Sequence, residues 1–377
     1  MPLSKIQDIG NQVVPNLGLK NAVINGAMQI SQRSTSEAAL GSGSSDICRT
    51  VDRIKFSHDS TSGRLTMSQN SPTDLPGFTK SVKLQVTTAL SSPAAGNYIQ
   101  LKYIFEGQQL QQFAKGTSSA KVMALSFYVK GNGNATYMCE LEDHDNGRNN
   151  QQQFSVTSSW NRVQLLYAGD TTGAFGNDVN ASMSILFWLV AGSTYSGGSY
   201  TANTWASPTT NKRAAGISNL YSSTSNFIEI TGLQLEPIQV TEFQHESFDE
   251  TLIKCQRYYQ KIGRDFSDSS PLTAFAWGYT SSASAAQGML QFERRMRIKP
   301  TFTQSTDQNL DFKTNAGPGA VHSSNAFTSV VTSETSAEFT QQNHASNFGG
   351  AGQPYFLKWN GVQGTGLAAS VQLDAEL

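Results

Sequence analysis

The chain has 377 residues, which is long enough for two or three domains with hydrophobic cores. Its 27 Lys and Arg residues nearly cancel its 28 Asp and Glu residues, and charged residues make up only 15% of the chain. Nucleic-acid binding normally needs a basic stripe, because phosphate neutralisation dominates the affinity, and we find none, so we expect no nucleic-acid partner. The longest apolar run, ILFWLVAG at 185–192, is far shorter than the roughly 20 residues of a membrane helix, so it predicts a buried strand and no membrane insertion.

Residues 1–20 are too short for a domain and are interrupted by glycine and proline, so they predict an N-terminal arm. They contain no apolar signal core, and we therefore expect synthesis in a cytoplasm rather than classical secretion. Cys48, Cys139 and Cys255 lie far apart and fit no metal-ligand or redox spacing. We expect three buried, reduced thiols, as in a protein made in a reducing compartment.

The region 21–246 contains many short segments in which apolar and polar residues alternate, separated by clusters of Gly, Ser, Asn and Pro. This pattern predicts an antiparallel β-sandwich. The expected strands are 53–57, 81–88, 97–105, 121–131, 135–142, 161–168, 182–192 and 226–237.

The segment SFDETLIKCQRYYQKIG, residues 247–263, changes this period. Ser247 and Glu250 have the spacing of a capping box, and Gly263 is suited to close the C-terminus of a helix. One apolar face recurs at the spacing of a helix, through Leu252, Cys255, Tyr259 and Ile262. We predict a connector helix over 247–263 that ends one domain and packs against the next.

Strand signals resume after this segment, at 272–280, 288–298, 336–342, 354–361 and 369–377. The fold class expected from the chain is therefore all-β. Its parts are an N-terminal arm (1–20), a β-sandwich (21–246), one connector helix (247–263) and a small C-terminal β domain (264–377).

Several unusual sequence motifs occur in this order along the chain: NAVINGAMQISQR (21–33), TVDRIKF (50–56), ALSFYVKG (124–131), SSWNRVQLLY (158–167), ITGLQLEPIQVTEFQH (230–245) and CQRYYQ (255–260). Together they resemble a module that recurs in bacteriophage and prophage tail-fibre and other virion proteins. Its usual form begins with an NGxMxIWQR-like stretch, continues with ADRW, and closes with a QLE segment followed by LCQRYYQ.

The resemblance covers about 20–262 and implies a jelly-roll sandwich similar to carbohydrate-binding modules attached to glycan-active enzymes. It also implies a homotrimer on the phage particle. Ser31 and Ile54 stand where the family pattern commonly has Trp, so no ligand role is carried over to those positions. The C-terminal part resembles the family's small β domain more loosely, through FERRMRIKPTFTQS (292–305) and the final LDAEL.

Catalysis is not expected. The chain has no GxSxG elbow and no cysteine–histidine signature, and its five histidines are scattered. A glycosidase needs two opposed carboxylates, and no segment singles out such a pair. We predict a protein that is not an enzyme and has no cofactor.

The loop EDHDNG, residues 142–147, offers the oxygens of Asp143, Asp145 and Asn146, the kind of ligand that calcium prefers. The spacing is not that of an EF-hand loop, and Asp-Asn-Gly is also ordinary turn chemistry. We therefore predict no metal, with Asp143 and Asp145 as the calcium candidates if one is present.

The segment STYSGGSYTANTW, residues 193–205, interleaves Tyr195, Tyr200 and Trp205 with small polar residues. Rigid aromatic rings give contact area at low entropy cost, and the polar residues between them adapt to a ligand. These three residues are our candidates for glycan binding. The alternative is a long loop whose aromatic side chains fold back onto the core or pack on a neighbouring subunit.

A second aromatic set comprises Trp277, Tyr279, Tyr355 and Trp359. Alternation places Phe275, Trp277 and Tyr279 on one face of a strand, where packing in the core or between subunits is favoured over ligand contact.

These observations predict a structural bacteriophage virion protein, a tail-fibre or spike component that attaches to a host surface glycan. The arm, 1–20, would dock on other phage structural proteins. The alternative is a capsid-decorating cement or head-fibre protein without a ligand.

Overall fold

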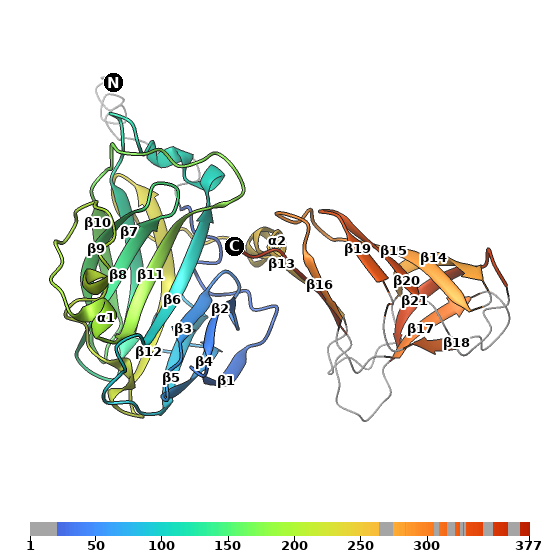
Figure 1. Cartoon of the computed structure of the whole chain (residues 1–377), viewed down its shortest axis with the longest axis horizontal. Coiled ribbons are helices and arrows are strands. Elements are labelled where there is room, and N and C mark those ends of the chain that lie inside the picture. Colours follow the sequence, from blue (N-terminus) through green and yellow to red (C-terminus); the bar gives the residue numbers. More distant parts are fainter. Residues whose placement is uncertain are drawn as a thin grey trace, which may run out of the picture.

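The computed structural model describes residues 21–263, 274–282, 284–304, 309–314, 321–324, 327, 329–341, 350–360 and 370–377. The predicted arm, 1–20, lies outside the described residues. Figure 1 shows a larger sandwich joined to a smaller β part. The all-β prediction is confirmed. No helix within the described ranges is long and apolar enough to cross a membrane.

The sandwich consists of two six-stranded antiparallel sheets, which we name sheet A and sheet B. Sheet A has the order β1 (Ser36–Leu40), β4 (Arg64–Asn70), β5 (Ser81–Thr88), β12 (Phe227–Pro237), β7 (Met123–Gly131) and β10 (Asn161–Tyr167). Sheet B has the order β2 (Ser44–Cys48), β3 (Lys55–Asp59), β6 (Tyr98–Glu106), β11 (Ala181–Ala191), β8 (Ala135–Asp143) and β9 (Arg148–Val156). Short helical turns lie in the connections, at Gly107–Gln109, Gln111–Phe113, α1 (Ser193–Ser196), Thr210–Lys212 and Leu220–Ser222.

The core of the sandwich lies between the two sheets and follows the two-residue period of the strands. Phe127 of sheet A meets Phe187 of sheet B edge to face, with ring centroids 5.0 Å apart. Strand β11 is buried on both of its faces, as the sequence predicts, because the segment after it folds over the outer side of sheet B. All three cysteines are buried and unpaired.

The helix after the sandwich, α2 (Phe248–Gln256), is shorter than the predicted 247–263. Its start is as expected, because Ser247 and Glu250 form both hydrogen bonds of the capping box. Its end is not, since residues Tyr259–Gly263 form strand β13 instead of continuing the helix. The backbone pairing of β13 with β22 and the burial of Tyr259 under the Arg33 guanidinium, 3.7 Å from the ring centroid, explain the difference.

The smaller part contains two antiparallel sheets. The three-stranded sheet has the order β13, β22 (Ser370–Asp374) and β16 (Thr301–Gln304). The seven-stranded sheet has the order β18 (Val321–Ser324), β17 (Asn309–Thr314), β21 (Pro354–Asn360), β14 (Ala274–Ser282), β15 (Ala285–Gln291), β20 (Ser336–Gln341) and β19 (Ser329–Thr332). Its core includes Leu290, Phe339, Tyr355 and Leu373.

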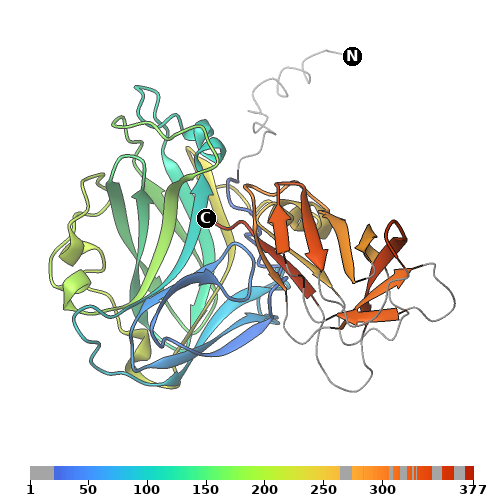
Figure 2. The same cartoon turned by 45° about the vertical axis from the view of Figure 1, so that its right-hand side comes forward.

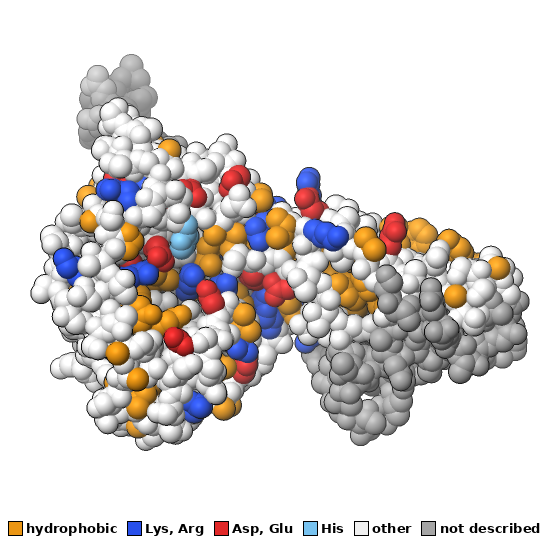
Figure 3. All heavy atoms as spheres, viewed as in Figure 1, with side chains coloured by type: hydrophobic (Ala, Val, Ile, Leu, Met, Phe, Trp, Pro, Cys, Tyr) orange, Lys and Arg blue, Asp and Glu red, His pale blue; other side chains and the backbone are white. Residues whose placement is uncertain are grey.

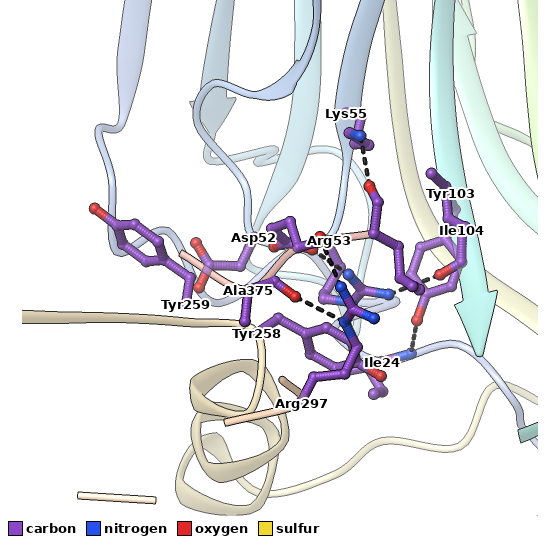
Figure 4. Close-up of polar contacts among 12 residues, drawn as sticks. Ile24, Asp52, Arg53, Lys55, Tyr103, Ile104, Tyr258, Tyr259, Arg297 and Ala375 are labelled. Atoms are coloured by element: carbon purple, nitrogen blue, oxygen red, sulfur yellow. Dashed lines mark hydrogen bonds and ion pairs between the residues drawn. The ribbon is translucent and has the colours of Figure 1, made fainter. Parts of the chain in front are cut away.

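The two parts meet at a polar junction, and in Figure 2 the C-terminus lies between them. Arg53 of the sandwich is only 2% exposed, and its guanidinium donates to the Ile104 carbonyl and pairs with the Glu376 carboxylate. The same guanidinium lies 3.5 Å from the centroid of the Tyr258 ring. Figure 4 shows the side chains of Arg53, Tyr258 and Arg297 converging at this junction. The junction therefore buries a charge together with its partner.

Candidate ligand-binding face of the sandwich

The outer face of sheet B is the side that Figure 1 shows in front, over β3, β6 and β11. Strand alternation sends Phe56, Leu101 and Phe187 into the core, so their neighbours point outward. Two cross-strand rows result. One row runs Ser57, Gln100 and Trp188, and the other runs Lys55, Lys102 and Leu186.

Charged side chains border these rows on the β2 side. The Lys102 ammonium lies 3.1 Å from one carboxylate oxygen of Asp46, and the Lys55 ammonium lies 3.6 Å from the other. Asp46 is the most exposed of the three, with 41% of its side chain accessible. Figure 3 shows acidic and basic side chains gathered on this face. The border therefore offers both hydrogen-bond donors and acceptors to a ligand.

A second charged group lies on the β8 side of the face. Glu140 is fully buried, and its carboxylate accepts hydrogen bonds from Trp188 Nε1 at 2.7 Å, Asn149 Nδ2 at 2.7 Å and Arg213 Nε at 2.9 Å. Burial raises the pKa of Glu140, an effect that the Arg213 guanidinium opposes. Arg213 also pairs with Glu142 at 2.8 Å. These contacts fix the segment that carries Arg213 onto the sheet.

His144 closes one end of the face, and its Nε2 lies 2.7 Å from the hydroxyl oxygen of Ser184. Burial lowers the pKa of His144, while the charge of Glu142 raises it and that of Lys102 lowers it. Glu142 lies on β8 and Lys102 on β6, and both side chains are on the outer face of sheet B, where His144 also lies. Burial is the largest of these effects, so the pKa of His144 lies below its ordinary value.

The aromatic loop predicted from the sequence covers the opposite end of the face. Tyr195 packs edge to face on Tyr98, with centroids 5.5 Å apart, and its centroid lies 5.2 Å from that of Trp188. Tyr200 joins the same cluster. Tyr98, Tyr195 and Tyr200 remain partly exposed, so they pack on the sheet and still border the open face.

Trp205 lies apart from the two tyrosines. It packs against the main core, and its Nε1 donates to the Ala168 carbonyl at 2.6 Å. The structure therefore brings together two of the three aromatic residues proposed from the sequence. Their role in glycan binding stays a prediction.

The calcium candidates are engaged by protein groups. Asp143 is 1% exposed, and its carboxylate pairs with the Lys115 ammonium at 2.5 Å. Asp145 accepts a hydrogen bond from the backbone N–H of Gly176. In the described part of the chain, no group of three or more His, Cys, Asp or Glu side chains could hold a metal ion. The Lys115 ammonium takes the place beside Asp143 that a cation would take.

Sequence reasoning missed the polar residues Asp46, Ser57, Gln100 and Lys102. Each sits in a strand whose alternation is equally typical of an ordinary solvent-facing surface. Their gathering depends on pairing between β2, β3 and β6, which the chain order does not reveal. Ser57 and Gln100 are buried, so the accessible groups of the face are the charged side chains of Asp46 and Lys102 and the partly exposed tyrosine rings. Charged groups and aromatic rings on one face are suited to a ligand rich in hydroxyl groups.

Comparison with known proteins found no matching family model and no matching curated protein. Among solved structures, the chain is similar to a family 4 carbohydrate-binding module at 10% identity and a TM-score of 0.30, covering 56% of this chain and 97% of that one. It is similar to the enzymatically active domain of tailspike protein 4 of bacteriophage CBA120 at 13% identity and a TM-score of 0.29, covering 58% of this chain and 21% of that one. A family 11 carbohydrate-binding module of a cellulosomal cellulase from Clostridium thermocellum matches at 12% identity and a TM-score of 0.27, covering 54% of this chain and 99% of that one. The solved structures to which this chain is similar thus include carbohydrate-binding modules and a phage tailspike domain, all at low sequence identity.

Proposed function

We propose that the chain binds a saccharide on the outer face of sheet B. The observation that carries this proposal is the accessible part of this face, where the Lys102 ammonium lies 3.1 Å from the half-exposed Asp46 carboxylate and where Tyr98, on the same side of β6, keeps part of its side chain exposed. A sugar presents hydroxyl groups at its edge and C–H groups on its face, so it uses both kinds of partner at once. The weak net charge of the chain fits an uncharged ligand.

The role is binding rather than catalysis. Glu140 is the most deeply buried carboxylate of the face, and three different side chains donate to it. The Glu140 side chain has no exposed surface, so its carboxylate does not reach a bond of a ligand on the outer face. Glu142 is likewise held by Arg213. Both contacts support a protein without enzymatic activity.

A place in a bacteriophage particle is supported by four sequence motifs that follow one another along the chain: NAVINGAMQISQR, TVDRIKF, ITGLQLEPIQVTEFQH and CQRYYQ. On this proposal the chain is a homotrimeric tail-fibre or spike component, made in the host cytoplasm and carried on the virion. Residues 1–20 attach it to other phage proteins, and the saccharide belongs to the host surface. Three copies raise avidity without any new contact.

A matched pair of lysine variants tests the binding face. Lys102 and Lys83 are both half-buried lysines within strands, Lys102 on β6 of sheet B and Lys83 on β5 of sheet A. On an array of bacterial surface polysaccharides, Lys102→Gln is expected to weaken binding by about ten-fold, the effect of losing roughly 1.4 kcal/mol. Lys83→Gln is expected to bind like the wild type. If both variants bind equally well, the outer face of sheet B is excluded as the binding site.

Cryo-electron microscopy of the particle separates attachment from decoration. Copies around the tail are expected for an attachment protein, whereas copies spread over the shell would favour the capsid-decorating alternative. Light scattering of the purified protein is expected to give three times 40.8 kDa. A monomer at micromolar concentration would contradict the trimer.

A further inference from the structure

A hydrophobic patch lies on the seven-stranded sheet of the smaller part. Trp277 and Tyr279 of β14 are 57% and 52% exposed, and Val331 of β19 is 59% exposed. Figure 3 shows hydrophobic side chains gathered on the smaller part, where Figure 1 draws β14. The sequence favoured packing in the core or between subunits for these rings. Their exposure excludes packing in the core of this chain.

The opposite side of the sheet shows why these rings point outward. Gly278 and Gly288 face each other across β14 and β15. A Cβ added at Gly288 would lie 2.6 Å from Phe339 Cζ and 2.6 Å from the Tyr355 hydroxyl oxygen. Phe339 and Tyr355 are buried and fill that side, so a register shift that turned Trp277 inward would collide with them. The exposed aromatic face is therefore built into the packing of the sheet.

A hollow of about 360 Å³ lies on this exposed face. One row of side chains across its strands runs Trp277, Met289, Glu338 and Val331. The next row runs Tyr279, Gln287 and Thr340. The Tyr279 hydroxyl donates to Gln287 Oε1 at 2.8 Å, which fixes both side chains at the edge of the hollow. The hollow thus has two aromatic rings at one side, Val331 at the other and polar groups between them.

The chemistry of this hollow selects its occupant. A second copy of the chain would cover the apolar groups but would also bury the Glu338 carboxylate, and burying an uncompensated charge is costly. A sugar ring avoids that cost, because its hydroxyl groups donate to Glu338 and its C–H face lies against the Trp277 ring. The volume is at the lower end of ligand pockets, about 300–1,000 Å³, and suits a small ligand. We propose that the hollow between Trp277, Tyr279 and Glu338 is a second saccharide site, independent of sheet B.

This inference rests on the proposed function, and it adds a second contact per chain. Two sites on one chain bind a repeating surface polysaccharide more tightly than either site alone, provided that the polymer reaches both. The smaller part is then a recognition element in its own right.

The test uses the full chain with Lys102→Gln, in which the site proposed on sheet B is expected to be weakened by about ten-fold. Saturation-transfer NMR is recorded with the methyl glycosides of glucose, galactose and N-acetylglucosamine. Transfer to at least one glycoside is expected to persist in this background. Adding Trp277→Ala is expected to weaken that binding by on the order of ten-fold or more, since a contacting aromatic ring is lost. Glu338→Ala, at an exposed position, is expected to weaken it as well.

Phe248→Ala is the matched control, because Phe248 is 56% exposed but lies on α2, outside the hollow. It is expected to leave binding unchanged. The inference is overturned if the Lys102→Gln background shows no transfer, or if transfer survives both Trp277→Ala and Glu338→Ala. It is also overturned if Trp277→Ala lowers the molar mass and leaves binding intact, which would make the face a contact between copies. If Lys102→Gln binds the polysaccharide array more weakly than the wild type and also shows no saturation transfer, the second site is excluded. The proposed site on sheet B is then still supported.

Discussion

Replacing Arg53 by methionine tests whether the junction between the two parts contributes to stability. Methionine keeps much of the aliphatic volume but removes the guanidinium. The Glu376 carboxylate, which has only 8% of its side chain exposed, then loses its closest partner and keeps Arg33 at 3.6 Å. The Ile104 carbonyl loses the donor that lay 2.7 Å away.

The expected magnitude follows from this burial. Breaking a buried ion pair by removing one partner costs about 3–5 kcal/mol, because the other charge stays buried. The remaining contact of Glu376 with Arg33 places Arg53→Met near the lower end, about 3 kcal/mol. Glu376→Gln leaves the Arg53 charge buried and is expected to cost a similar amount. The double variant removes both charges, so it is expected to cost about 2–3 kcal/mol less than the sum of the two single variants.

Guanidinium-induced unfolding, followed by tryptophan fluorescence and far-UV circular dichroism, measures these free energies. The matched control is the surface pair Arg295–Glu334, whose side chains are 72% and 40% exposed. Arg295→Met is expected to change stability by about 0–1 kcal/mol. Additive effects of Arg53→Met and Glu376→Gln, or a loss no larger than that of Arg295→Met, would refute the reasoning about the buried charge.

Three further outcomes are expected from buried or capping groups. Burial raises the pKa of Asp52 from 3.8 to about 6, so this carboxyl favours folding most below pH 4 and loses that contribution as the pH rises through 6. Between pH 4 and 7 the unfolding free energy of the wild type should therefore fall by up to about 3 kcal/mol more than that of Asp52→Asn. Parallel pH profiles of the wild type and the variant would contradict this. Lys115→Met should cost about 3–5 kcal/mol, while EDTA should leave the wild-type Tm unchanged because Lys115 neutralises Asp143, and a Tm that falls with EDTA would instead indicate a bound metal. Ser247→Ala should cost about 1 kcal/mol by denaturant unfolding, since it removes the acceptor that caps α2, and no loss would mean that the cap is dispensable.

Much of the strand pattern could be predicted from local alternation. The expected strand 226–237 corresponds to β12 (Phe227–Pro237), and 182–192 corresponds to β11 (Ala181–Ala191). The end of α2 could not be predicted, because Tyr259 fits a helical face in the sequence equally well. Its place in β13 is decided by pairing with β22, from the far end of the chain.

The candidate sites show the same division. The aromatic segment 193–205 could be identified from its own composition, and Tyr195 lies at the edge of the outer face of sheet B. Gln100 and Lys102 carry no local signal, since their importance comes from neighbours on β3 and β11. Likewise, alternation puts Trp277 and Tyr279 on one side of a strand, but only the packing of the other side decides that this side is exposed.

A crystal structure of the chain with the oligosaccharide that binds best on the polysaccharide array tests the central claim most directly. We expect density for a sugar ring on the outer face of sheet B, with hydroxyl groups in hydrogen-bond range of Lys102 or Asp46 and a C–H face against Tyr98. Additional density in the hollow beside Trp277 is compatible with this account. Sugar density confined to other surfaces, with the outer face of sheet B bare at saturating oligosaccharide, would contradict it.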